Sequence, residues 1–334
     1  MSYIRDDQLE ACEKRLRDLQ GRGLYTGADD LDVPVLWQHS YRHLEHPGEP
    51  SMHTVSSIAL EVLHDLPGEL ALLSFAEEKV LRNLVQASGY YHLTEFEEID
   101  AAESLIRRLW CTILFPPPEV DSEIPVLILP SEIMMMVMQA YMRDGVKETR
   151  ARVLMALSQI TAMLYLFGVF PADRAQSLVA EAVKGTFSDN EELIRRCIRV
   201  SFEYVVLDNG EEMLIHPALV NPMKLAETRT FVPAVREVSP VRLQQAFSGV
   251  LGEERRAVML LRGAITGIVR QENDLQSIIE DLLFMAKQDA TEADMRAVLA
   301  AALIVKPTAD CDNAIHRLWL ETQRWPMAYH GKVH

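Results

Sequence analysis

Hydrophobic residues recur every three or four positions along most of the chain, with polar residues between them. This spacing is typical of helices that bury one face. Glycines, prolines and capping residues divide the pattern into separate helices. The pattern predicts an all-α fold of roughly a dozen helices, over residues 9–19, 33–46, 55–66, 69–89, 95–115, 131–145, 153–167, 171–184, 188–201, 240–252, 253–271, 274–288, 291–305 and 311–325.

One stretch breaks this pattern, YVVLDNGEEMLIHPAL at 204–219. Its two arms are apolar and partly β-branched, which favours strands. Asn209-Gly210 between them is a preferred pair for a type I′ turn. The sequence therefore predicts one β-hairpin in an otherwise helical chain. The short run VLIL, between Pro125 and Pro130, is consistent with either a strand or an extended linker.

The predicted helices at 153–167, 171–184 and 188–201 come directly before this hairpin. Three helices followed by a hairpin is the order of a winged helix, in which the third helix is the candidate recognition helix and the hairpin is the wing. We therefore expect a winged-helix-like module here. In it, the hairpin covers one edge of a helical core that is too small to bury its own apolar surface.

Two irregular stretches divide the chain. Three prolines at 116–118 and the polar run after them are typical of a domain boundary. Residues 221–238 form a second irregular stretch. We predict an acidic N-terminal helical unit at 1–118, a winged-helix-like module with its preceding helix at 119–225, and a C-terminal helical unit at 226–334.

Charge and cysteine usage narrow the function classes. The formal net charge is −16, and residues 1–120 hold 21 acidic against 10 basic side chains. A protein with this excess of negative charge is disfavoured from binding nucleic acid or an anionic membrane. The cysteines (Cys12, Cys111, Cys197 and Cys311) are far apart in apolar helical patterns, which predicts buried free thiols. With the charged start MSYIRDDQLE, which is unlike a signal peptide, this indicates the cytoplasm.

Residues 153–170 are free of charged side chains over 18 positions, the lower limit for a membrane-spanning helix. Ser158, Gln159 and Thr161 interrupt the segment, and Gly168 closes it. We interpret it as a buried central helix, and we expect no membrane association.

The third helix of the module carries Arg195, Arg196 and Arg199, the candidate nucleic-acid contacts. Helix pairing explains them equally well, because Glu191 and Glu192 precede Arg195 and Arg196 by four residues. Three carboxylates (Asp208, Glu211 and Glu212) flank the hairpin turn and would repel phosphates. The charge pattern therefore favours a structural or protein-docking module over a DNA-binding one.

His39, His43 and His46 follow a helical spacing that brings all three imidazoles to one face. Zinc sites use histidines at such spacing, so a metal site is one interpretation. No HExxH motif or cysteine partner completes a ligand set. The alternative is a helix C-terminus, where the dipole favours histidine.

Five methionines (Met134, Met135, Met136, Met138 and Met142) crowd the predicted helix at 131–145. They are explained either by an adaptable protein-binding surface or by flexible core filling. The chain has no Walker loop, GxGxxG, GxSxG or CxxC motif. A catalytic nucleophile also needs a base beside it, and the sequence alone indicates no such pair of residues. These absences lean away from an enzyme and from a bound cofactor.

The stretches YLFGVFP, LIHPAL and LWLETQRWPMAYHG resemble, in order and spacing, a group of uncharacterised cytoplasmic bacterial proteins related to SEC-C-motif-associated proteins. The resemblance covers about residues 120–334. Glu321-Thr322-Gln323-Arg324 departs from the Asn-Thr-Arg of that group, and its cysteine-rich zinc motif is absent, so no zinc site or catalytic role is implied. The residues that carry the resemblance are Tyr165, Gly168, Pro171, His216, Pro217, Leu219, Thr322, Trp325, His330 and Gly331.

Together these patterns predict a non-enzymatic cytoplasmic protein that binds another protein or a second copy of itself and has an interaction or regulatory role. A winged-helix DNA-binding regulator that uses Arg195, Arg196 and Arg199 is the first alternative. A metal-dependent enzyme that holds zinc at His39, His43 and His46 is the second.

Overall fold

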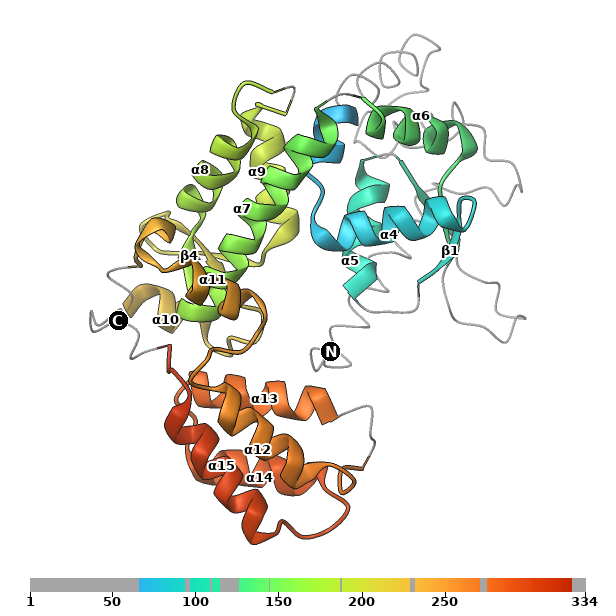
Figure 1. Cartoon of the computed structure of the whole chain (residues 1–334). Helices are drawn as coiled ribbons and strands as arrows, with labels where there is room; N and C mark the ends of the chain where they lie inside the picture. Colours follow the sequence, from blue (N-terminus) through green and yellow to red (C-terminus); the bar gives the residue numbers. More distant parts are fainter. Residues whose placement is uncertain are drawn as a thin grey trace. The chain divides into compact units, whose positions relative to one another are not determined.

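The computed structural model describes residues 66–93, 97–108, 110–114, 126–143, 145–186, 188–228, 232–270 and 275–325 (Figure 1). Helices dominate these ranges, which confirms the mainly α fold class. None of the helices described combines the length and the apolar character needed to cross a membrane. His39, His43 and His46 lie outside the described residues, as do Cys12, His330 and Gly331.

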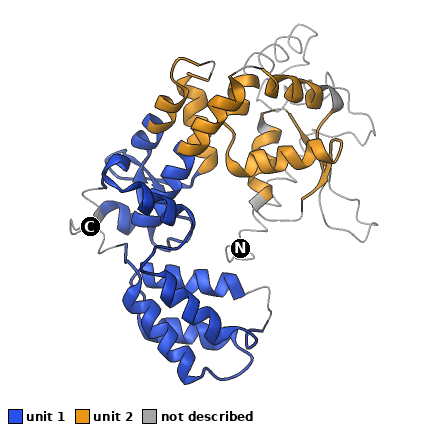
Figure 2. Ribbon diagram, in the orientation of Figure 1, with its two compact units in different colours: residues 1–3, 156–177, 202–334 blue, residues 4–155, 178–201 orange. Residues whose placement is uncertain are grey.

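The chain forms two compact units, each built from separate stretches (Figure 2). Within the described ranges, unit 1 holds residues 156–177 and 202–325, and unit 2 holds residues 66–155 and 178–201. The division passes through α7 (Val146–Phe167) and α8 (Ala172–Val183). The predicted three-part organisation with boundaries near 118 and 225 stays a prediction.

Unit 2 combines short helices with a three-stranded antiparallel sheet, β1-β3-β2. Leu127 in β3 lies opposite Tyr91 in β1 and Ile113 in β2. The core contains Leu70, Val80, Leu105, Trp110, Ile133 and Val137. Besides residues 66–71, which are helical, the elements are α4 (Phe75–Gln86), β1 (Tyr90–His92), α5 (Glu97–Arg107), β2 (Thr112–Leu114), β3 (Val126–Ile128), α6 (Ser131–Tyr141) and α9 (Glu191–Ser201).

Unit 1 has its own three-stranded antiparallel sheet, β4-β6-β5. The central strand β6 (Glu212–Ile215) pairs with β4 (Val169–Pro171) and with β5 (Tyr204–Val206). After it come α10 (Pro222–Thr228), a short 3-10 helix (Val235–Glu237), α11 (Pro240–Phe247) and a packed set of four helices, α12 (Arg255–Ile265), α13 (Leu275–Lys287), α14 (Glu292–Ala302) and α15 (Ala309–Glu321).

The hairpin β5–β6 is present, but it is not alone and its turn is not type I′. Each sheet also contains at least one strand that the sequence pattern does not predict, because its residues lie within or next to helical patterns. A type I′ turn needs positive φ at both central residues, whereas only Gly210, at +82°, is positive in this loop. The Gly210 N–H donates to Leu207 O and the Leu207 N–H to Glu211 O. The loop is therefore a three-residue turn in which glycine takes the left-handed position.

Several predicted helices have different limits, and α7, for example, begins at Val146 and not at residue 153. The helix predicted over 69–89 is interrupted, because Ser74 caps a new helix, α4, with a full capping box to Glu77. The helix predicted over 95–115 ends at Arg107, and residues 112–114 pair with β3 instead. The VLIL run contains β3, so the strand interpretation is confirmed there.

The apolar stripe predicted for residues 153–167 is confirmed, because Val153, Leu157, Ile160, Leu164 and Phe167 in α7 are all buried. Three cysteines are buried and free, as expected: Cys111, Cys197 and Cys311. Burial raises the pKa of Cys197 to about 12, so this thiol stays protonated at neutral pH.

Candidate functional site

The three arginines predicted as nucleic-acid contacts lie on α9, and they have different surroundings. Arg195 is held at 2.8 Å by Glu191 and at 3.2 Å by Glu192, an arrangement that confirms the predicted i,i+4 pair to Glu191. Arg199 is exposed. Arg196 departs from the prediction, because its ion pair is with Glu69 at 2.8 Å and not with Glu192.

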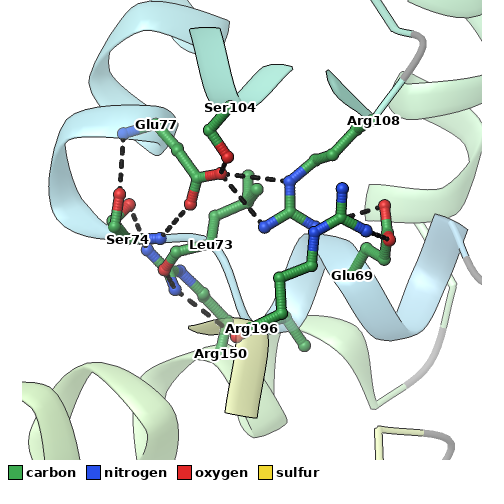
Figure 3. A network of polar contacts seen from close by, with 9 residues as sticks. Glu69, Leu73, Ser74, Glu77, Ser104, Arg108, Arg150 and Arg196 are labelled. Atoms are coloured by element: carbon green, nitrogen blue, oxygen red, sulfur yellow. Dashed lines mark hydrogen bonds and ion pairs between the residues drawn. The ribbon is translucent and has the colours of Figure 1, made fainter. Parts of the chain in front are cut away.

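Arg196 belongs to a buried ionic network in unit 2 (Figure 3). At its centre, the Arg108 guanidinium lies between two carboxylates, 3.0 Å from Glu77 and 3.2 Å from Glu69. The Ser104 hydroxyl donates to Glu77 Oε1 at 2.6 Å. The Ser74 N–H donates to the other oxygen, Oε2, at 2.7 Å. Every carboxylate oxygen of Glu77 thus has a partner.

Arg150 forms hydrogen bonds with the turn that leads into α4. Its guanidinium donates to the carbonyl oxygens of Leu73 and Ser74 and pairs with Glu78 at 2.8 Å. These carbonyls lie between the helix that ends at residue 71 and the start of α4. Arg150 therefore adds a donor to the Ser74 carbonyl, which also accepts from the Glu78 N–H of α4, and supplies a donor to the buried Leu73 carbonyl.

Electrostatics in the network favour the ionised forms of its central pair. Burial alone would raise the pKa of the Glu77 carboxyl, but Arg108 and Ser104 outweigh it and hold that pKa below its usual value. Burial alone would lower the pKa of Arg108, but Glu77 and Glu69 raise it. This pair stays charged and mutually satisfied, an arrangement that positions elements and leaves no group poised for proton transfer.

A second buried cluster lies in unit 1. Lys287 Nζ is 2.7 Å from Glu254 Oε1, and the Tyr165 hydroxyl donates to Glu254 Oε2 at 2.7 Å. The Lys287 ammonium also lies 4.1 Å from the centre of the Tyr165 ring, within cation–π distance. Burial lowers the pKa of Lys287, and Glu254 opposes this effect.

Several residues that carried the family resemblance pack around this cluster. The Trp325 indole N–H donates to the Tyr165 carbonyl at 2.9 Å, and the His216 ring lies 5.2 Å from the Trp325 ring. Gly168 leaves so little space that an added Cβ would lie 2.9 Å from Trp325 Cδ2. Motif residues from three distant stretches therefore form one core.

His216 is neutral in this core. Burial, with the nearby Lys287 ammonium, lowers the pKa of His216 to about 3. Its Nδ1 accepts a hydrogen bond from the Ala218 N–H at 3.2 Å. The ring also contacts Phe284, with centroids 4.6 Å apart. These contacts give His216 a packing role at the end of the hairpin.

The methionines of α6 divide between two faces of the helix. Met134 and Met136 pack against the core of unit 2. Met135 and Met138 lie on the outer face, Met142 is the C-cap residue directly after α6, and the three have 54, 51 and 76% of their surface exposed. The spacing of these three, i, i+3 and i+7, makes one continuous stripe, which we call the methionine face. Core filling is therefore confirmed for Met134 and Met136, whereas protein binding by the three exposed methionines stays a prediction.

In the ranges that the structure describes, no group of three or more His, Cys, Asp or Glu side chains is arranged to hold a metal ion. The histidine triad at 39, 43 and 46 falls outside those ranges, so the zinc interpretation stays a prediction.

The network could be found only in part from the sequence. The Ser74-x-x-Glu77 spacing is a capping-box signal that marks the start of α4. The pairing of Arg196 with Glu69 joins residues 127 positions apart, and no local spacing indicates it.

Comparison with protein families, with curated proteins and with solved structures finds no match to this chain.

Proposed function

We propose that this protein is a non-enzymatic cytoplasmic interaction or regulatory protein, and that it binds a partner protein through the methionine face of α6. The observation that carries the proposal is the exposure of Met135, Met138 and Met142 in a single stripe. Methionine side chains are flexible and polarisable, so such a surface adapts to apolar partners of different shape.

The inner face of α6 does not need these residues. Ile133, Val137 and Ala140 are buried and already anchor the helix to the core of unit 2. The exposed methionines keep half or more of their surface outside this core. Covering apolar surface gains about 25 cal/mol for each Å² removed from water. An apolar helix or strand laid along the stripe would therefore bind favourably.

A triple variant tests this proposal: Met135→Gln with Met138→Gln and Met142→Gln. Glutamine keeps the length and helix propensity of methionine and removes its apolar surface. Proteins bound to tagged wild type and to the variant in cells would be identified, and the affinity of each purified candidate partner measured by calorimetry. We expect the variant to bind its partner at least tenfold more weakly at unchanged thermal stability.

Met155→Gln is the matched control, because Met155 is equally exposed in unit 2 but lies on α7. Its partners should be retained. An unchanged set of partners and unchanged affinities in the triple variant would reject the methionine face as the docking surface.

A winged-helix DNA-binding regulator is the second candidate. The chain order α7, β4, α8, α9, β5, β6 and the sheet order β4-β6-β5 favour it, because a winged helix has this connectivity. The charge pattern argues against DNA binding. The carboxylates of Glu191, Glu192 and Glu69 already pair with Arg195 and Arg196.

An electrophoretic shift with duplex DNA at increasing salt tests this candidate. A DNA-binding regulator should shift the duplex at low salt and lose the shift as salt rises. Arg195→Ala with Arg199→Ala should abolish it. A shift that survives the double replacement excludes α9 as the contact, and no shift at low salt excludes this candidate.

A further inference from the structure

α12 presents a surface with an unusual combination of charge and apolar character. Its sequence, RRAVMLLRGAI, contains three arginines and no acidic residue. Met259 and Leu260 are 67 and 47% exposed. Together with Gly252, Arg255 and Arg256, they line a shallow open hollow. We call these five residues the α12 surface.

Among the residues that the structure describes, the two arginines of this surface have no ionic partner. No carboxylate in the described part of the chain pairs with Arg255 or Arg256. The two preceding glutamates are already engaged, Glu253 with Arg242 at 2.9 Å and Glu254 with Lys287 at 2.7 Å. The positive charge of the hollow is therefore not neutralised by its neighbours.

The position of these arginines is also unfavourable for the helix itself. They are the first two residues of α12, where the helix dipole disfavours cations. No side chain caps α12 at Glu254, and the Glu254 carboxylate itself accepts from the Leu251 N–H at 3.0 Å and from the Tyr165 hydroxyl and pairs with Lys287. A local arrangement that opposes stability is often retained for binding.

We propose that the α12 surface binds an acidic amphipathic helix of a partner protein. Apolar side chains of that helix would cover Met259 and Leu260. Its carboxylates would pair with Arg255 and Arg256 and relieve the unfavourable charge at the start of α12. This surface lies on a different helix from the methionine face, so the inference does not depend on the proposed function.

The net negative charge of the whole chain favours an acidic helix as the partner over an anionic membrane or a nucleic acid. Anionic membranes and nucleic acids present many negative charges, and a protein of net charge −16 is repelled by such extended surfaces. A single amphipathic helix presents only a few carboxylates next to an apolar stripe. It therefore matches a small basic and apolar surface without bringing more negative charge near the rest of the chain.

Fluorescence anisotropy with a synthetic helical peptide tests the inference. The probe is a fluorescein-labelled peptide with leucines along one face, flanked by glutamates. A second peptide has lysine at every glutamate position, and a third has the first composition in scrambled order. We expect the full-length protein to bind the acidic amphipathic peptide at least tenfold more tightly than either of the others.

The decisive variant is Arg255→Glu with Arg256→Glu. It should bind the acidic peptide at least tenfold more weakly and gain affinity for the lysine peptide, a charge exchange that misfolding could not produce. Met259→Gln should weaken binding of the acidic peptide without favouring the lysine peptide. Circular dichroism would verify that each variant is folded.

The matched control is Arg143→Glu with Arg236→Glu, which changes the net charge equally at two exposed arginines outside α12. This control should bind the acidic peptide like wild type. Failure of wild type to bind the peptide, or equal weakening by both double variants, would overturn the inference.

Two further measurements separate other occupants. Sedimentation could show self-association that Arg255→Glu with Arg256→Glu abolishes, in which case a second copy covers the surface and the inference is wrong. Binding to phosphatidylserine vesicles that the same variant abolishes would likewise assign the surface to a membrane and overturn it.

Discussion

At the scale of single residues, Gly168 is the position in unit 1 where the backbone and its neighbours leave least room. Its φ of +74° is unfavourable for any residue with a Cβ. An added Cβ would lie 2.8 Å from Leu225 Cδ2 and 2.9 Å from Trp325 Cδ2. The positive φ and the close contacts would both make a replacement of Gly168 unfavourable. A second glycine with a similar φ and no close contacts is needed to separate the two effects.

Gly168→Ala should lower the free energy of unfolding by several kcal/mol, as measured by urea denaturation. Gly185→Ala is the matched control, because Gly185 has a similar φ of +71° after α8 and open space around its Cβ position. The control should cost about 1–2 kcal/mol for the backbone alone. Equal losses in the two variants would show that the contacts with Leu225 and Trp325 relax freely.

We expect His216 to make unit 1 sensitive to acid. Its folded pKa is about 3 against an ordinary value of 6.5, so between these pH values the unfolded chain binds a proton that the folded chain does not. Stability contributed by this group is therefore lost as pH falls from 6.5, by about 1.4 kcal/mol per pH unit.

His216→Gln should flatten the stability profile between pH 6.5 and 4, measured as the midpoint of thermal unfolding in a pH series. The exposed His316 serves as the control, and His316→Gln should keep the slope of the wild type. If His216→Gln keeps that slope too, other groups carry the acid sensitivity.

At the scale of elements, the ionic network of unit 2 joins α4, α9 and, through Ser104 and the following Arg108, α5 to residues 66–71. The arginines of this region differ in burial, so their replacement should have graded effects. Arg108→Met leaves Glu77 buried without its partner and should cost about 3–5 kcal/mol. Arg196→Met should cost about 1.5–3 kcal/mol, since its pair with Glu69 is partly buried. Arg195→Met should cost less than about 1 kcal/mol.

Urea denaturation of the three variants measures this order. The Arg195 variant is the internal control, because its ion pairs with Glu191 and Glu192 lie on the exposed face of α9. A loss for Arg195→Met as large as for Arg108→Met would contradict the assignment of the network as the support of unit 2.

The elements themselves could be predicted where hydrophobic periodicity is long enough to be unambiguous. Helices such as α7 and α9 follow their stripes. The strands β1, β2 and β4 have only three residues each, too few for alternation to stand out. Trp110 to Ile113 are all buried and mostly apolar, so this run extended the expected helix past its true end.

The same limit applies to the candidate sites. The pairing of Glu191 with Arg195 follows from helical spacing. The pairing of Arg196 with Glu69, and of Lys287 with Glu254, depends on tertiary folding. Sequence showed that α6 is rich in methionine, and only the burial of Ile133 and Val137 shows which of its faces remains exposed.

At the scale of the whole molecule, the two units have separate hydrophobic cores, one around Trp110 and one around Trp325. Opening of one core should therefore leave the backbone of the other protected. Trp325→Ala should destabilise its unit by about 3–5 kcal/mol through the cavity it leaves.

Hydrogen exchange followed by mass spectrometry measures this separation. In the Trp325→Ala variant, amides of β4, β6 and α13 should exchange faster, and amides of β1, β3 and α5 should exchange at the rate of the wild type. The opposite replacement, Leu105→Ala in the core around Trp110, is the control and should reverse the pattern. Uniform acceleration in either variant would mean that the molecule unfolds as one cooperative body.

The hydrogen bond from Trp325 to Tyr165 spans 160 residues, and it has a consequence for synthesis on the ribosome. At roughly 5–20 residues per second, Trp325 follows Tyr165 after about 8–32 s. During that interval α7, β4 and β6 are already made, but the indole that fills the space beside Gly168 is missing. The nascent chain therefore exposes the apolar surface of this core until translation has passed residue 325, and this surface is where chaperones would be needed.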